Sequence, residues 1–303
     1  MSHGVALVLG GGGAAGNAWT IGVIAGLADA GVDLTAAADL VIGTSAGATT
    51  AAQVRSGMPP AELYAAVLTE LDRPGARSQA RPPSLPMATV FDRMRSISAT
   101  AASAIELQRM MGAFGLESDA LLGPETGQWR AIVAGRLSRP EWPDRRMIVV
   151  AVDAESGELA AFDRESGVEL VDAVAASTSL PGMVHTYGIN GRHYISGGVR
   201  SPDNADLASG FSNVVVLSPL GGRNGPLPEG QFEGLRRPPE WGADLAGQVE
   251  TLRREGSRVE VITPDADSQV AMGTNQMDLA TRIPSARAGF AQGKREVTRV
   301  RFG

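Results

Sequence analysis

The sequence has no cysteine among its 303 residues and a single lysine, Lys294. The lack of cysteine excludes disulfides, thiolate metal sites and a cysteine nucleophile, and it is typical of a protein in a reducing cytosol. Aromatic residues make up only 5% of the chain, so Ala, Val, Leu and Ile must supply most of the core.

An excess of positive charge and long apolar runs are also lacking. The net charge is −6 and neither end is basic, so nucleic-acid binding and a polybasic clamp on membranes have no electrostatic support. Glycine or charge interrupts every apolar run within about ten residues, which is too short for a membrane span. The start of the chain lacks the features of a signal peptide. We therefore expect a cytoplasmic protein.

Short apolar segments alternate with helical ones along the chain. Their patterns predict buried strands at 5–9, 40–42, 146–152, 159–162, 193–195, 213–218 and 259–262. Strands that alternate with helices predict an α/β fold, a three-layer sandwich whose central sheet is mostly parallel and has helices on both faces. We expect one domain over residues 1–303, with a helical cap at about 73–120.

A methionine cluster marks the region expected to form the cap. Residues 88–112 are predicted to be helical, and they contain Met94, Met110 and Met111, with Met87 just before them. These side chains either fill the core or form an adaptable apolar lid, because methionine packs against varied shapes.

The segment Gly43-Thr44-Ser45-Ala46-Gly47 has the form G-x-S-x-G and lies between a predicted strand and a predicted helix. A sharp turn in this context exposes the serine Oγ, and the small neighbours tolerate a strained backbone. The N-terminus of the following helix favours a developing negative charge. The pattern alone is common by chance, so its weight depends on the rest of the chain.

A glycine run, Gly10-Gly11-Gly12-Gly13, follows the first predicted strand. Backbone N–H groups in such a run can converge on one oxygen and form an oxyanion hole. A phosphate-binding P-loop would require a Gly-Lys-Ser/Thr element, which is missing here. The spacing of Gly11, Gly13 and Gly16 also matches a dinucleotide fingerprint. That fold, however, expects an acidic residue where the second strand runs into Ser45.

Together these segments resemble the patatin-like phospholipase family. The resemblance continues, in the family's order, through Ala175-Ala176-Ser177, Leu180-Pro181-Gly182, Tyr194-Ile195-Ser196-Gly197-Gly198-Val199 and Pro202-Asp203-Asn204-Ala205-Asp206. It implies a serine–aspartate dyad on an α/β sheet that hydrolyses acyl esters of lipids, without a metal or cofactor. The expected partner is a lipid or other acyl ester, with transient contact to a membrane surface allowed, and the oligomeric state stays open.

The resemblance also assigns roles to individual residues. It implies Ser45 as the nucleophile and Gly11, Gly12 and Gly13 as the oxyanion hole. The glycines that support the motifs are Gly10, Gly16, Gly43, Gly47, Gly197 and Gly198.

The position of the dyad aspartate departs from the family pattern, because Ser196 precedes Gly197-Gly198 where the family has Asp-Gly-Gly. A serine hydroxyl is a very weak base at neutral pH and adds no negative charge. General-base catalysis contributes about 10²–10⁴-fold, so the sequence predicts an impaired or inactive hydrolase. The alternative is a non-catalytic lipid- or acyl-binding protein on the same scaffold.

Three explanations of Ser196 are open: an engineered substitution, a natural change to binding or sensing, or a substitute base. The candidates for that base are Asp203, Asp206, His193 and His185. The two histidines lack acidic partners at ligand spacing, so no metal site is predicted.

Overall fold

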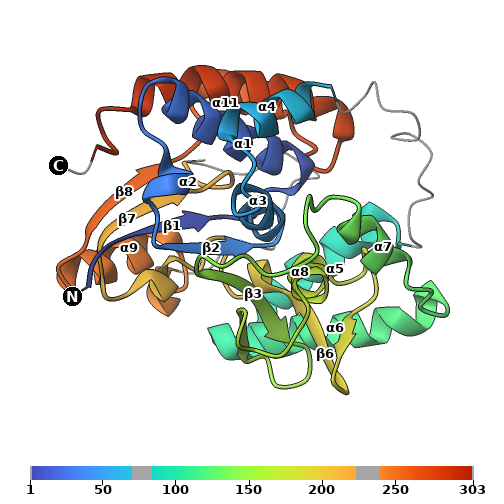
Figure 1. The fold of residues 1–303 in the computed structure, drawn as a ribbon. Coiled ribbons are helices and arrows are strands. Elements are labelled where there is room, and N and C mark those ends of the chain that lie inside the picture. Colours follow the sequence, from blue (N-terminus) through green and yellow to red (C-terminus); the bar gives the residue numbers. More distant parts are fainter. Residues whose placement is uncertain (1, 70–83, 223–238, 302–303) are drawn as a thin grey trace.

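A computed structural model describes residues 2–69, 84–222 and 239–301 (Figure 1). Its centre is an eight-stranded sheet of order β5-β6-β3-β2-β1-β7-β8, with β4 paired to β3. The strands are β1 Ser2–Leu9, β2 Leu40–Thr44, β3 Met147–Asp153, β4 Leu159–Phe162, β5 Tyr187–Ile189, β6 Arg192–Ser196, β7 Phe211–Leu217 and β8 Arg258–Ile262. Strands β3, β2, β1, β7 and β8 are parallel to one another, whereas β4, β5 and β6 pair antiparallel.

Helices cover both faces of this sheet, as Figure 1 shows. They are α1 Gly13–Asp29, α2 Leu34–Ala37, α3 Ala46–Val54, α4 Pro60–Leu68, α5 Met87–Thr100, α6 Ala104–Leu122, α7 Gln128–Ala134, α8 Leu170–Thr178, α9 Leu245–Arg254, α10 Ala266–Met272 and α11 Arg282–Glu296. Short 3₁₀ turns, η2 Gly197–Val199 and η3 Ala205–Ala208, follow β6. The predicted three-layer α/β fold is therefore confirmed.

Burial on both faces explains why β1 is apolar from Val5 to Leu9. Leu7 and Leu9 belong to the core under α1, α3 and α8, whereas Ala6 and Val8 belong to the core under η3 and α9. Successive side chains of a strand point to opposite faces, and here both faces are buried. A continuous apolar run is the expected result.

Glycines bring α1 and α11 into backbone contact. A Cβ at Gly22 would overlap Ala286 O, and one at Gly26 would overlap Phe290 O. Trp19 of α1 is fully buried and its indole N–H donates to Gln292 Oε1 at 3.1 Å. The first helix is thus enclosed between the sheet and α11, which lies above it in Figure 1.

Residues 88–112 are mostly helical, as predicted, and the chain divides them between α5 and α6. Ser103 caps α6 by accepting a hydrogen bond from Glu106 N at 3.3 Å, and Glu106 accepts one from Ala102 N at 2.8 Å. Met94 and Met111 are buried in a core with β3 and β6, so they fill the core. Residues 73–83 of the expected cap lie outside the described residues.

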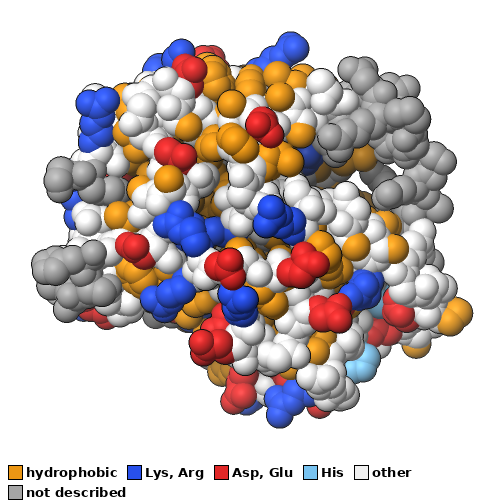
Figure 2. Space-filling model, viewed as in Figure 1, with side chains coloured by type: hydrophobic (Ala, Val, Ile, Leu, Met, Phe, Trp, Pro, Cys, Tyr) orange, Lys and Arg blue, Asp and Glu red, His pale blue; other side chains and the backbone are white. Residues whose placement is uncertain are grey.

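The space-filling view in Figure 2 shows acidic and basic side chains interspersed over the face in view, with apolar side chains between them. Within the described residues, no helix is long and apolar enough to cross a membrane.

Candidate active site

Ser45 lies at a sharp turn between β2 and α3, as the G-x-S-x-G pattern predicted. Its φ is 54° and its ψ is −120°. Among the described residues, the only other non-glycine residues with positive φ are two asparagines, which tolerate this region better. The turn leads directly into α3, since Ser45 O accepts hydrogen bonds from Ala48 N at 2.9 Å and Thr49 N at 3.4 Å. Ser45 is partly exposed, and its Oγ has no hydrogen-bond partner in the described chain.

The two flanking glycines allow close approach of backbones around this turn. A Cβ at Gly43 would lie 2.6 Å from Ala48 Cα, and one at Gly47 would overlap Leu9 O. Helix α3 therefore begins against the ends of its own strand and of β1. Larger side chains at either glycine would push the nucleophile away from the sheet.

The glycine run lies beside Ser45 at the end of β1. A Cβ on Gly11 would lie 3.4 Å from Ser45 Cβ. Gly11 N–H, however, donates to Pro202 O at 2.8 Å, so it is not available to a substrate oxygen. Gly12 and Gly13 N–H have no partner among the described residues. Of the three predicted oxyanion donors, Gly12 and Gly13 are therefore the two with an unpaired N–H among the described residues.

The geometry adds Ala14 to the candidate donors. It is the second residue of α1, is partly exposed, and its N–H has no partner in the described chain. The first N–H groups of any helix lack acceptors within the helix. This rule was the signal that could have found Ala14 from the sequence.

Strands β2 and β6 lie on the same edge of β3. Residues 149–150 pair with both β2 and β4, and residues 151–152 pair with both β6 and β4. Because a strand has only two edges, β2 and β6 must both occupy the edge opposite β4. Thr44 pairs with Val150 and Ser196 pairs with the next residue of β3. The last residues of β2 and β6 therefore meet along this edge of β3, and Ser196 lies next to Ser45.

Ser196 is 1% exposed, and its Oγ accepts a hydrogen bond from Gly198 N at 3.3 Å. This bond caps η2. Within the described residues, no hydrogen bond joins Ser196 to Ser45.

A buried serine of α8, whose role was not predicted, contacts the turn. Ser45 N–H donates to Ser177 Oγ at 2.9 Å, and Ser177 Oγ donates to Val150 O at 2.6 Å. The segment Ala175-Ala176-Ser177 belonged to the resemblance. Its place in the sequence did not reveal which residue this hydroxyl contacts.

Three of the four candidate substitute bases bond to other groups. Asp206 Oδ1 accepts from Arg200 at 3.0 Å, His193 Nδ1 lies 2.8 Å from Thr186 Oγ1, and His185 Nε2 lies 2.8 Å from Gly123 O. None of them has a hydrogen bond to Ser45 in the described chain.

Asp203 is the fourth candidate and is 2% exposed. Its Oδ1 lies against the Cα of Gly10, where a Cβ would overlap it, and has no hydrogen-bond partner. Burial raises the pKa of Asp203 to about 7, and the nearby Ser218 hydroxyl opposes this pKa rise. Asp203 Oδ1 and Ser218 Oγ both lack a hydrogen-bond partner, so Ser218 has only a weak effect on the pKa of Asp203. Asp203 lies on the η3 face of the sheet, under the glycine run.

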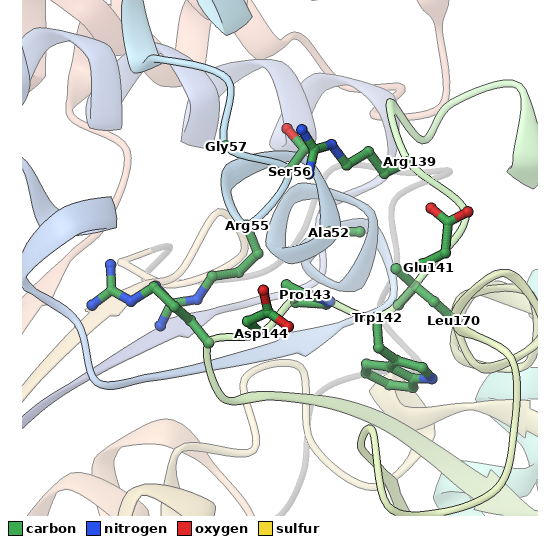
Figure 3. A pocket seen from close by; sticks show the side chains of 11 residues that line it. Ala52, Arg55, Ser56, Gly57, Arg139, Glu141, Trp142, Pro143, Asp144 and Leu170 are labelled. Carbon is green, nitrogen blue, oxygen red and sulfur yellow. The ribbon is translucent and has the colours of Figure 1, made fainter.

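A separate cavity of about 240 Å³ lies at the end of α3 remote from Ser45 (Figure 3). Its walls include Ala52 of α3, Arg55 directly after this helix, and Trp142. The Arg55 guanidinium donates to Thr35 O and Ala38 O at the end of α2, and Arg145 donates to the same carbonyls. Burial and the neighbouring Arg145 lower the pKa of Arg55 to about 10. These arginines bind helix carbonyls and are remote from the serine turn.

A serine on a strand-to-helix turn, beside a glycine run with free N–H groups, is the arrangement used by α/β serine hydrolases. Residues 7–209 match the family model described as Patatin-like phospholipase. The chain therefore belongs to the patatin-like phospholipase family. Within the described residues, no cluster of three or more metal-ligating side chains occurs.

Two solved structures illustrate how far the likeness extends. VipD from Legionella pneumophila is 13% identical, with a TM-score of 0.43 over 98% of this chain and 66% of VipD. The type III effector protein ExoU is 15% identical, with a TM-score of 0.37 over 96% of this chain and 54% of ExoU. The chain thus spans less than two thirds of either protein. No curated protein matches it.

Proposed function

We propose that this chain is a serine hydrolase of carboxylic esters, of lipids or of small molecules, in which Ser196 impairs catalysis. Membership of the patatin-like phospholipase family supports lipid esters as the substrate class. The observation that carries the proposal is the strand pairing: Thr44 and Ser196 pair with consecutive residues of β3. A carboxylate at position 196 would therefore lie beside Ser45.

In the proposed reaction, Ser45 Oγ attacks the ester carbonyl carbon and forms a tetrahedral intermediate. The N–H groups of Gly12 and Gly13 hold the oxyanion. The intermediate collapses, the alcohol leaves with a proton, and water hydrolyses the acyl-enzyme. A base must take the Ser45 proton in the first step, and Ser196 cannot act as that base. The expected loss is about 10²–10⁴-fold in rate.

The proposal also covers the domain organisation and the location of the protein. We propose one domain over residues 1–303, with α5 and α6 as the described part of a cap. Their core includes Val152 of β3 and Ile195, the residue before Ser196. A cap that packs against these residues would lie beside the site where Ser45 would bind the acyl group. We also propose a cytoplasmic location and transient contact with lipid surfaces.

A non-catalytic binding role on the same scaffold is the second candidate. It is favoured by the bond from Gly198 N–H to Ser196 Oγ, which keeps η2 capped without a carboxylate. On this account, the turn around Ser45 holds an acyl group without cleaving it.

The test compares Ser196→Asp with Ser196→Asn, which has the same shape without the charge. We expect Ser196→Asp to raise short-chain ester turnover and fluorophosphonate labelling by about 10²-fold or more over the parent. Ser196→Asn should stay at the parental rate, and Ser45→Ala in the Asp background should abolish labelling. A folded Ser196→Asp variant that neither labels nor turns over ester would refute the hydrolase and favour the binding protein.

A further inference from the structure

The C-terminal end of α8 contacts both Ser45, the proposed nucleophile, and Ser196, which stands where the family has the dyad aspartate. Ser45 N–H donates to the side chain of Ser177 at 2.9 Å. Ser196 N–H donates to the backbone carbonyl of Ser179 at 2.8 Å. One short segment therefore bonds to the backbones of Ser45 and Ser196, which are far apart in the sequence.

The Ser177 hydroxyl has a defined direction. It is fully buried and donates its proton to Val150 O at 2.6 Å. Its lone pairs remain free for Ser45 N–H, because a hydroxyl has one donor and two acceptor sites. Val150 is also the residue that pairs with Thr44, and a Cβ on Gly197 would overlap its carbonyl oxygen. The Val150 carbonyl thus lies between the nucleophile turn and the 196–197 turn.

The backbone of Ser45 needs such a partner. Its positive φ is unfavourable for a residue with a Cβ. Its N–H has also left the β2 ladder, since pairing with β3 ends at Thr44. Without the Ser177 hydroxyl, this N–H would be unpaired beside a closed core, where unsatisfied groups are unfavourable.

We propose that Ser177 is a positioning residue: its hydroxyl holds Ser45 in the strained turn and, with the Ser179 carbonyl, sets the distance between Ser45 and position 196. Ser177 touches no substrate in this scheme. The expected effect of Ser177 on kinetics rests on the proposed hydrolase function. Its effect on the backbone conformation of Ser45 does not.

The kinetic test uses the Ser196→Asp protein as the parent. We expect Ser177→Ala to lower kcat and the fluorophosphonate labelling rate by about 10²-fold, the loss typical of a misplacement of roughly 1 Å. KM should change little, because the substrate contacts remain. Ser177→Thr keeps the hydroxyl and should recover most of the rate.

The matched control is Thr178→Val in the same turn. Within the described residues, Thr178 Oγ1 donates only to the helix carbonyls of Val174 and Ala175. Thr178→Val should keep the parental kcat. Equal losses in Thr178→Val and Ser177→Ala would mean that any damage to this turn suffices, and would overturn the inference. An unchanged kcat in folded Ser177→Ala would also overturn it.

A crystal structure of Ser177→Ala in the chain that keeps Ser196 separates this inference from the proposed function. We expect the Ser45 backbone to leave its positive φ, whether or not the chain hydrolyses esters. A Ser45 turn that stays unchanged without the hydroxyl would refute the positioning role, even in an active enzyme. An inactive Ser196→Asp parent with a displaced Ser45 in Ser177→Ala would refute only the hydrolase.

Discussion

Replacing Asp203 by asparagine should stabilise the protein at neutral and alkaline pH and remove part of its pH dependence. The carboxyl group is 2% exposed, and its Oδ1 has no hydrogen-bond partner. Asparagine has the same shape as the protonated acid and carries no charge. It should therefore reproduce the form that the buried site favours.

The direction in which stability changes with pH follows from the pKa of Asp203 in the folded and unfolded states. Burial raises the pKa of Asp203 from 3.8 to about 7 in the folded protein, so the folded state binds the proton more tightly than the unfolded state. Stability is therefore highest below pH 4 with respect to this group, and it falls as the pH rises towards 7. The full difference is roughly 4 kcal/mol, at 1.36 kcal/mol for each pKa unit.

Urea denaturation followed by circular dichroism at pH 5 and pH 8 measures this effect. At pH 8, Asp203→Asn should unfold with a higher free energy than the parent, by up to roughly 4 kcal/mol. The gain should be much smaller at pH 5. A loss of stability at pH 8, or a gain that is the same at both pH values, would refute the reasoning.

Asp265 supplies the matched control. Burial alone would raise its pKa, but hydrogen bonds from Ser268 and from Arg295 outweigh burial and lower the pKa. Asp265 is therefore ionised in both the folded and unfolded states between pH 5 and pH 8. Asp265→Asn should change stability by the same amount at both pH values.

Two further substitutions test the framework around the serine turn. Gly47→Ala should destabilise the protein by about 1–3 kcal/mol or more, because its Cβ overlaps Leu9 O in a tightly packed site. Gly188→Ala, which meets nothing within 4 Å, should change the urea midpoint little by comparison. Asn17→Ala should cost about 1–3 kcal/mol, since it removes a buried hydrogen bond of 2.8 Å to Thr50 that ties α1 to α3. A thermal midpoint equal to that of the parent would contradict this role for Asn17.

Strands buried on both faces were predictable because their apolar runs are local. Residues 5–9 and 40–42 lie within β1 and β2. The short strand β5 was missed, although Asn190-Gly191 has φ values of 51° and 79° in its turn to β6. This dipeptide is a known hairpin signal. Likewise, Ser103 and Glu106 have the Ser-x-x-Glu spacing of a helix start, which could have shown that a new helix begins within the helical region 88–112.

The sequence by itself determined the chemistry that the chain can offer. It contains a serine framed by glycines between a strand and a helix, a glycine run at another strand end, and a hydroxyl where the family has a carboxylate. These features are local, because turns and helix ends depend on neighbouring residues.

Only the tertiary structure decided which of these groups are available. It bonds Gly11 N–H to Pro202, places the hydroxyl of Ser177 under Ser45, and buries Asp203 without a partner. Each of these contacts joins residues more than a hundred positions apart or depends on burial by several elements. The contact between Ser45 and Ser177 lies where β2 and β6 meet on one edge of β3, and strand pairing across such distances leaves no local pattern in the sequence.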